Sequence, residues 1–379
     1  MRLARAFPAL AALPVCLGSA AAQDDPLKLG GGDGDPYIHF QPYVQVDRLV
    51  WDDTPDAFRT ERSDLNAARV YVAAGAGDVS GLFAYDFVDG GFVKYALATY
   101  AVSDRLSVTA GQQDEPFSLT DLPGGKALTF ADASEIAALI PGDNVGISAL
   151  WDGGDYSVAG GVFGGDLRTG VDEEGLAYAA RVTWNPTGRG ERGPLVTHLG
   201  AAANYRDGAD LEAGFAQGVG AGLVPRRIIA IGGSGDVDAI TRANLEGAVQ
   251  RGPLILQSEL TYADIERRGG QADVAYAGYV QASWLVTGET QPYDVSYFTE
   301  IVPDRAVPDG GPGAIELALR LDAADFGDEG EVRRATVAAN WHLTAALRLG
   351  LNASYTKTED AGLPEDDFGL AFLRLQYAH

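Results

Sequence analysis

Five arginines lie on the polar face of stretches in which polar and apolar residues alternate. Guanidinium groups arranged in a row can bind anions. In "AIELALRLD", for example, Arg320 falls on the same face as Glu316 and opposite Leu319. A row of such groups beside water would pass anions from one group to the next. The alternative is that each guanidinium pairs with an acid of the same face and braces the wall. The arginines are Arg69, Arg242, Arg320, Arg348 and Arg374, and the candidate acids are Glu246, Glu259 and Glu316.

A second group of charges lies in the apolar stretch "DEPFSLTDLPGGKALTFADASEIAALIPGD", residues 114–143. Lys126 follows two glycines in a bend and is the candidate for a charge at the narrowest point of a passage; a solvated lysine is the alternative. Asp132 is placed to cap a short helix that contains Glu135. Because one net charge in a low-dielectric constriction strongly changes ion preference, the sign of any selectivity stays open.

No pattern of nucleophile, base or metal ligand suggests catalysis. The four histidines have no metal-ligand spacing, and no G-x-S-x-G turn is present. The single cysteine, Cys16, leaves no thiolate site once the N-terminal stretch is removed. We therefore expect neither an enzyme nor a metal cofactor.

The N-terminus has the pattern of an export signal. Arg2 and Arg5 precede a mostly apolar run, and Ala20-Ala21-Ala22 supplies a cleavage site, so we expect a signal peptide over residues 1–22. Residues 23–35, ending "GGGDGD", are expected to be a flexible leader rather than a calcium site. The formal net charge of −25 argues against a nucleic-acid partner.

Alternation with a period of two dominates the rest of the chain and predicts an all-β fold. The expected strands are about ten residues long, which is the length that a tilted membrane-spanning strand needs. Aromatic residues recur at their ends, as girdles at membrane interfaces require. Their polar faces carry full charges of both signs, which a wet lumen tolerates and a dry core does not. These features favour a transmembrane barrel over a soluble sandwich.

The count of expected strands is even, as in bacterial single-chain barrels. We predict a sixteen-stranded antiparallel barrel over residues 36–379. The strands are expected at 36–51, 66–75, 80–88, 92–102, 105–113, 144–152, 155–163, 177–185, 195–205, 240–250, 253–263, 273–284, 313–322, 333–343, 345–356 and 367–378.

Three long connections could narrow such a barrel, which is wide enough to leave an aqueous channel. Residues 114–143 are the third external loop, and their apolar composition predicts that they fold inward. Residues 206–239 form a Gly-rich external loop with the pair Arg226 and Arg227. Residues 285–312 form an unusually long connection on the periplasmic side. We expect the pore lining to include Arg69, Lys126, Asp132, Glu135, Arg226, Arg227, Arg242, Arg320, Arg348 and Arg374.

An ordered series of segments resembles the phosphate-selective porin O and P family of Gram-negative outer membranes. The segments are "AARVYVAAGAGDVSGLFAYDF", "GQQDEPFSL", "LTF", "PGDNVGI", "HLGAAANYR", "YVQASWLVTGETQPY", "GAIELALRLDAADF" and "VAANWHLTAALRLGLNASY". The resemblance implies a homotrimeric outer-membrane porin with inward-folded loops. It also implies a lumen lined by basic residues that pass phosphate or related anions.

The chain departs from the family pattern at three places. It has Ala67-Ala68-Arg69 where the family usually has paired arginines. It has Asp132-Ala133-Ser134 where the family usually has Glu-Arg-Ser, so one charge changes sign. The last residue is His379 where an aromatic residue is expected. These departures favour a weakly selective or even cation-preferring pore.

Acidic stretches concentrate in the expected external loops, in "WDDTPD", "DAADFGDEGE" and "TEDAGLPEDDF". They could hold divalent cations that bridge to lipopolysaccharide phosphates; solubilising loop charge is the alternative. The sequence as a whole predicts a passive channel for small ions in contact with outer-membrane lipid. A non-conducting structural or adhesive barrel, a cation-preferring general porin and a soluble exported β-protein are the alternatives.

Overall fold

The computed structural model describes most of the chain beyond the N-terminal stretch. The described residues are 27–31, 35–58, 60–168, 175–187, 195–211, 215–218, 220–224, 229–231, 237–268, 272–359 and 367–379. The predicted signal peptide and the pair Arg226 and Arg227 lie outside these ranges.

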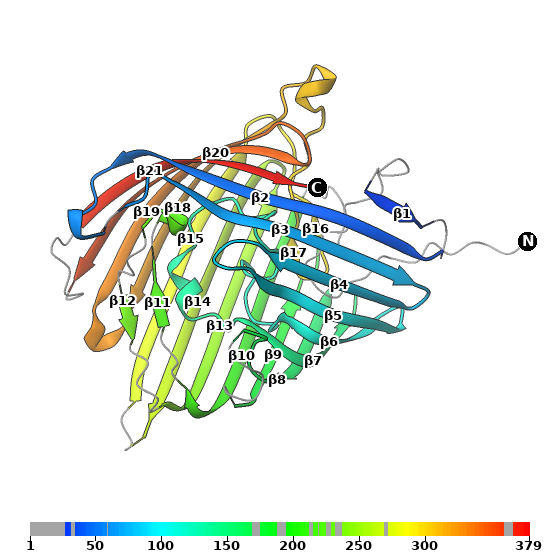
Figure 1. Ribbon diagram of the computed structural model, residues 1–379, viewed down its shortest axis with the longest axis horizontal. Helices are drawn as coiled ribbons and strands as arrows, with labels where there is room; N and C mark the ends of the chain where they lie inside the picture. The colour runs from blue at the N-terminus through cyan, green and yellow to red at the C-terminus, as the bar shows by residue number, and fades with distance from the viewer. Residues whose placement is uncertain are drawn as a thin grey trace, which may run out of the picture.

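The strands form one closed antiparallel barrel (Figure 1). Each strand pairs with its neighbours along the chain, and β2 closes the ring because it pairs with both β3 and β21. The sixteen strands of the ring are β2 (Tyr37–Asp52), β3 (Ser63–Ala76), β4 (Val79–Asp86), β5 (Phe92–Ser103), β6 (Leu106–Asp114), β7 (Asp143–Asp152), β8 (Tyr156–Phe163), β9 (Ala177–Trp184), β10 (Leu195–Leu211), β13 (Val237–Arg251), β14 (Leu254–Arg267), β15 (Ala272–Leu285), β18 (Ala314–Asp325), β19 (Glu331–His342), β20 (Leu347–Glu359) and β21 (Asp367–Ala378). The predicted sixteen-stranded barrel is thereby confirmed.

The alternation seen in the sequence separates two environments in the structure. In β18, Leu319 is 46% exposed on the outer surface, whereas the next residue, Arg320, is 2% exposed. In β20 the same contrast holds between Leu349 at 41% and Arg348 at 6%. Apolar side chains therefore cover the outside of the barrel and polar side chains face its interior, the reverse of a soluble protein.

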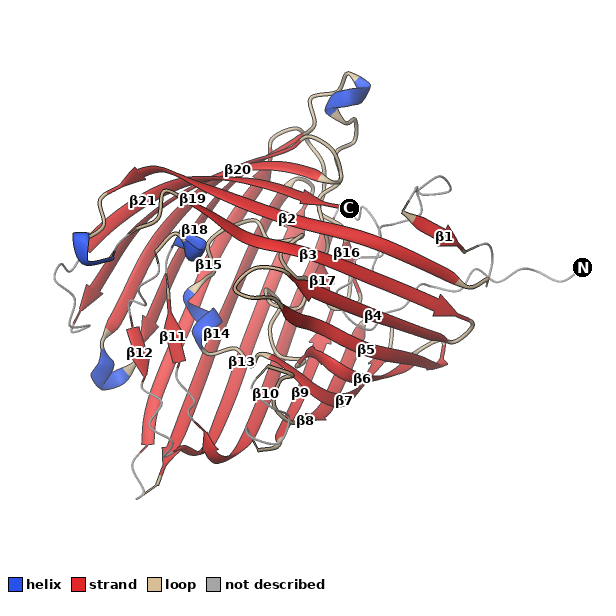
Figure 2. Cartoon of the chain, in the orientation of Figure 1, coloured by secondary structure: helices blue, strands red, loops and turns tan. Residues whose placement is uncertain are grey.

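Short elements join or extend the barrel strands (Figure 2). The strand β1 (Lys28–Gly30) lies in the predicted leader and pairs with the start of β2. β11 (Phe215–Gln217) pairs with β12 (Ile229–Ile231), and β16 (Tyr293–Asp294) pairs with β17 (Tyr297–Phe298). The 3-10 turns are η1 (Asp56–Phe58), η2 (Glu135–Ala138), η3 (Gly220–Gly222), η4 (Val307–Asp309) and η5 (Gly327–Glu329). Within the described ranges, no helix has the length and apolar composition to cross a membrane.

Two details of the sequence prediction are wrong. The connection expected over 206–239 is shorter at both ends, because the ladder between β10 and β13 continues through Arg206 and Asp207. The helical turn η2 follows Ser134 and has no side-chain cap. Asp132 does not cap it, because its carboxylate accepts hydrogen bonds from the backbone of Gly220 and Ala221.

Candidate functional site

The interior of the barrel holds a dense network between its polar wall and residues 114–143, which we call loop 114–143. The loop leaves the wall after β6 and returns to it at β7. Its contacts reach strands that lie far along the chain, and four groups of contacts hold the part of the loop from Ser118 to Leu139.

The first group is a clamp made by Glu259 of β14. Its carboxylate accepts hydrogen bonds from Ser118 Oγ at 2.8 Å, Leu119 N at 3.0 Å and Thr120 N at 2.9 Å. Asn244 of β13 donates to the same carboxylate at 2.9 Å. Because a carboxylate accepts hydrogen bonds more strongly than a neutral group, this clamp fixes the first turn of the loop.

The second group holds the middle of the loop against β18, β19 and β20. Thr129 Oγ1 donates to Glu316 at 2.9 Å, and Asn340 Nδ2 donates to the Thr129 carbonyl at 2.7 Å. Asn352 Oδ1 accepts from the backbone N–H of Ala131 at 3.0 Å. Wall side chains therefore satisfy backbone groups that would otherwise be buried without partners.

The third group contains two arginines and three carboxyl groups. Arg334 Nη1 donates to Asp132 at 2.9 Å, and Arg334 Nη2 lies 2.9 Å from Glu135 Oε1. Arg320 Nε donates to Asp322 at 2.8 Å. Two guanidinium groups cannot neutralise three carboxylates. Burial, opposed by Arg334 and assisted by Asp322 and Asp132, raises the pKa of Glu135 to about 7.

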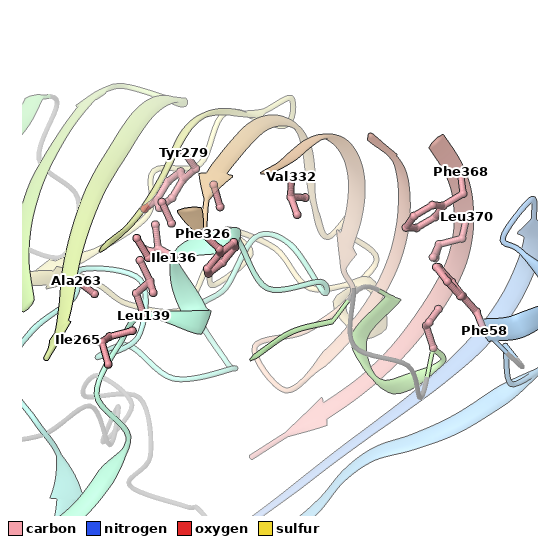
Figure 3. Close-up of a cluster of buried hydrophobic side chains, with 14 of the residues drawn as sticks. Phe58, Ile136, Leu139, Ala263, Ile265, Tyr279, Phe326, Val332, Phe368 and Leu370 are labelled. Atoms are coloured by element: carbon pink, nitrogen blue, oxygen red, sulfur yellow. The ribbon is translucent and has the colours of Figure 1, made fainter. Parts of the chain in front are cut away.

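The fourth group is apolar (Figure 3). Ile136 and Leu139 of the loop are fully buried in one cluster with Ala263, Ile265 and Tyr279 of the wall. Burial of each branched side chain contributes about 1.5–3 kcal/mol. The apolar residues that made this loop unusual as a sequence thus pack against the barrel.

The start of the loop is fixed by another buried acid, Glu115. It accepts hydrogen bonds from Arg206 Nη2 at 2.6 Å, Asn144 Nδ2 at 2.7 Å and Asn204 Nδ2 at 2.6 Å. Arg242 Nη1 donates to Asn204 Oδ1 at 2.7 Å. This predicted pore arginine therefore belongs to the network that supports the loop.

The other predicted wall arginines also have structural partners. Arg374 donates to Asp47 at 2.7 and 2.5 Å, and Arg69 forms an ion pair with Asp86. Arg348 donates to the Leu128 carbonyl at 2.6 Å, within the loop. Four of the five are nearly inaccessible, with exposed fractions between 2% and 7%: Arg242, Arg320, Arg348 and Arg374.

The acids proposed as partners of these arginines have other roles. Glu246 forms an ion pair with Arg181 of β9 at 2.7 Å and contacts His198 Nε2 at 3.1 Å. Glu259 and Glu316 bind the loop, as described above. Bracing by charge pairs does occur, but the acids that pair with Arg320 and Arg374 are Asp322 and Asp47.

Two side chains that the sequence analysis did not select are Lys94 and Tyr95 of β5. The ladder between β4 and β5 slips at this point, so Ala84 opposes Tyr95 while Tyr85 opposes Val93. Lys94 binds Asp143, and Tyr95 OH donates to Asp114 at 2.7 Å. Because a bulge puts two consecutive side chains on one side, strict alternation could not find Lys94.

Three partly exposed cations lie over tyrosine rings: Arg69 of β3, Lys94 of β5 and Lys126 of loop 114–143. Arg69 lies 5.6 Å from the centroid of Tyr43, Lys94 5.2 Å from Tyr95, and Lys126 5.7 Å from Tyr71. The side chains of Arg69 and Lys94 are 20% and 22% exposed. Lys126 Nζ also donates to the carbonyl of His379 at 2.9 Å. Cations beside rings at this distance are stabilised by the ring quadrupole.

The connection between β15 and β18 also contacts the interior network. Arg181 donates to Ser296 Oγ at 3.0 Å and to the Ser296 carbonyl at 2.9 Å. Tyr293 OH lies 2.6 Å from His198 Nδ1. Tyr297 packs with Leu119 and Leu122 of loop 114–143 in a buried cluster. Loop 114–143 and the connection between β15 and β18 therefore pack against each other.

An apolar outer surface, a charged interior and closure of the first strand on the last together define a transmembrane β-barrel of the outer-membrane type. The sequence profile of the phosphate-selective porin O and P family matches residues 64–379. The chain belongs to that family, as the resemblance predicted, and its place is the bacterial outer membrane.

Comparisons with individual solved structures agree with the barrel fold. An uncharacterised protein of Caulobacter vibrioides is 24% identical over 273 residues, which is 65% of this chain and 52% of that relative. Similar solved structures include an anion-selective porin of Comamonas acidovorans (14% identity, 91% of this chain and 100% of that chain, TM-score 0.56). The outer-membrane channel DcaP of Acinetobacter baumannii is also similar (12%, 91% and 97%, 0.55). So is the trimer form of Vibrio cholerae OmpT (11%, 91% and 99%, 0.55).

Proposed function

We propose that loop 114–143 narrows the pore and that ions pass between this loop and the wall formed by β3 to β7. The observation that carries the proposal is the distribution of exposure inside the barrel. The arginines that contact the loop from β18 and β20 are inaccessible, whereas Arg69 and Lys94 on β3 and β5 keep about a fifth of their side-chain surface exposed.

We further propose that selectivity between anions and cations is weak. Each partly exposed cation has a nearby acceptor: Asp86 for Arg69, Asp143 for Lys94 and the His379 carbonyl for Lys126. A phosphate ion would have to compete with carboxylates for Arg69 and Lys94, which reduces any preference for phosphate. Small ions of both signs are therefore the expected solutes, with no catalytic step.

The test is a reversal-potential measurement in a KCl gradient with purified protein in planar bilayers. The wild-type pore should conduct with a reversal potential near zero, and Lys126→Glu should move it toward cation preference. Addition of phosphate should reduce the chloride current only at millimolar concentration. A folded barrel without conductance would favour the alternative of a structural or adhesive barrel. Phosphate block at micromolar concentration would instead indicate a phosphate-selective pore.

We also propose that the protein is a homotrimer surrounded by outer-membrane lipid and lipopolysaccharide. Support comes from the trimer form of the similar OmpT structure and from the family itself. Chemical cross-linking in membranes followed by gel electrophoresis should give a band of three protomers that dissociates on heating.

A further inference from the structure

The carboxylate of Asp121 differs from every other charged side chain of loop 114–143. Among the residues that the structure describes, it has no hydrogen bond and no ion pair, and it is half-buried. Each of the others has a partner: Asp114 has Tyr95, Glu115 has Arg206, Lys126 has His379, Asp132 and Glu135 have Arg334, and Asp143 has Lys94.

The backbone that carries Asp121 is nevertheless held in place. Its N–H lies 3.3 Å from Ser118 Oγ, and its carbonyl accepts from Gly124 N at 3.1 Å. The preceding residues are gripped by Glu259, as described above. Asp121 thus has a fixed position while its carboxylate takes no part in holding the loop.

The charged groups whose electrostatic fields act on the Asp121 carboxylate lie on four barrel strands. They are Lys94 of β5, Asp114 of β6, Asp143 of β7 and Glu259 of β14. Lys94 is already bound to Asp143, and Glu259 is occupied by the loop backbone. Burial raises the pKa of Asp121 to about 6, with Asp143 and Glu259 acting in the same direction and Lys94 opposing them.

We propose that Asp121 is the residue that determines cation admission in this pore, and that its protonation switches the ion preference. The inference rests on the proposed function, because it needs ions to pass beside loop 114–143. The ionised carboxylate attracts cations into a space of low effective dielectric. When it is protonated, the partly exposed Arg69 and Lys126 dominate the local potential. The permeability to anions then increases relative to the permeability to cations.

The experiment compares wild type, Asp121→Asn and Asp89→Asn in planar bilayers. Reversal potentials are measured in a KCl gradient at pH 5.0 and pH 7.5. Asp89 is an exposed aspartate in the connection after β4, and its φ of 52° suits asparagine, so its substitution is the matched control. Heat-modifiable gel mobility verifies that each variant folds.

The wild-type and Asp89→Asn pores should show a cation-to-anion permeability ratio about threefold higher at pH 7.5 than at pH 5.0. Asp121→Asn should keep the low permeability ratio at both pH values. Asp121→Glu should restore the increase of this ratio with pH. Glu135 titrates in the same range but is buried against Arg334, so it should contribute little. A conducting wild-type pore with a pH-independent ratio overturns the proposal. So does an Asp121→Asn pore that keeps the whole change. Absence of conductance in every variant overturns the proposed function and this inference with it.

Discussion

At the residue scale, a single carboxylate of the barrel wall anchors the start of loop 114–143. Glu259 receives two backbone N–H groups of loop 114–143 and hydroxyl groups from Ser118 and Thr120. In Glu259→Gln the side chain keeps its shape but loses its charge, and its NH₂ group faces other donors. We expect the anchoring of the loop to weaken by about 1–3 kcal/mol. Single-channel recordings should show larger current fluctuations.

The matched control for that prediction is Glu266→Gln on the same strand. Glu266 is exposed on the outside of the barrel. Its substitution should leave the current noise at the wild-type level. Equal noise in Glu259→Gln and Glu266→Gln would show that the clamp does not restrain the loop.

Glu135 gives the loop a dependence on pH. Burial raises its pKa from 4.5 to about 7, a difference worth roughly 3 kcal/mol. When the pKa of an acid is raised in the folded state, the acid's contribution to the stability of that state is complete at a pH below the pKa of the unfolded chain. This contribution is lost as the pH rises through the raised pKa of the folded state. Wild-type current noise should therefore increase between pH 5 and pH 8. Glu135→Gln, which imitates the protonated form, should keep the low noise at pH 8. A variant noisier than wild type at pH 8 would contradict this account.

At the scale of elements, the strand that leads into the loop depends on one glycine. Gly111 of β6 has φ of +122°, and a Cβ there would lie 2.1 Å from the carbonyl oxygen of Ala96. Gly111→Ala should destabilise the pairing of β5 and β6 by about 2 kcal/mol or more. The fraction of protein that migrates as folded barrel in unheated gels should fall.

Gly142→Ala is the control at the other end of the loop. Nothing lies within 4 Å of a Cβ built at Gly142, and its φ is not in the left-handed region. This variant should fold as well as wild type. If both variants fold equally well, β6 tolerates a side chain at residue 111 and the argument from close approach is wrong.

The strands could be predicted from the sequence because alternation is a local property that each ten-residue stretch carries by itself. Side-chain roles could not, because they depend on contacts between distant segments. Ser118 and Glu259 are 141 residues apart, and Ala131 and Asn352 are 221 apart. Facing the interior was predictable for Arg320 and Arg348, but being covered by the loop was not. Lys94 was missed because a bulge interrupts the alternation on which the prediction relied.

At the scale of the whole molecule, the outer surface should tolerate charge according to depth in the membrane. Leu319 lies in the middle of β18 and Ile315 lies near its start, and both are exposed outward. Leu319→Arg should lower the free energy of unfolding in lipid vesicles by about 2–4 kcal/mol, and Ile315→Arg by about 0–1 kcal/mol. Urea titrations followed by tryptophan fluorescence measure both. Equal losses of unfolding free energy would contradict the placement of Leu319 nearer than Ile315 to the midplane of the membrane.

The pairing of β2 with β21 has a consequence for biogenesis. The ring is incomplete until the last strand has been synthesised, and the groups that restrain loop 114–143 reside mostly on strands made after it. A partly inserted chain therefore holds the two ends of the loop through Lys94 and Tyr95 of β5, but lacks the contacts that hold its middle. If loop 114–143 narrows the pore as proposed, the narrow passage forms late in assembly, and a chain that stalls before closure would leave a wider opening.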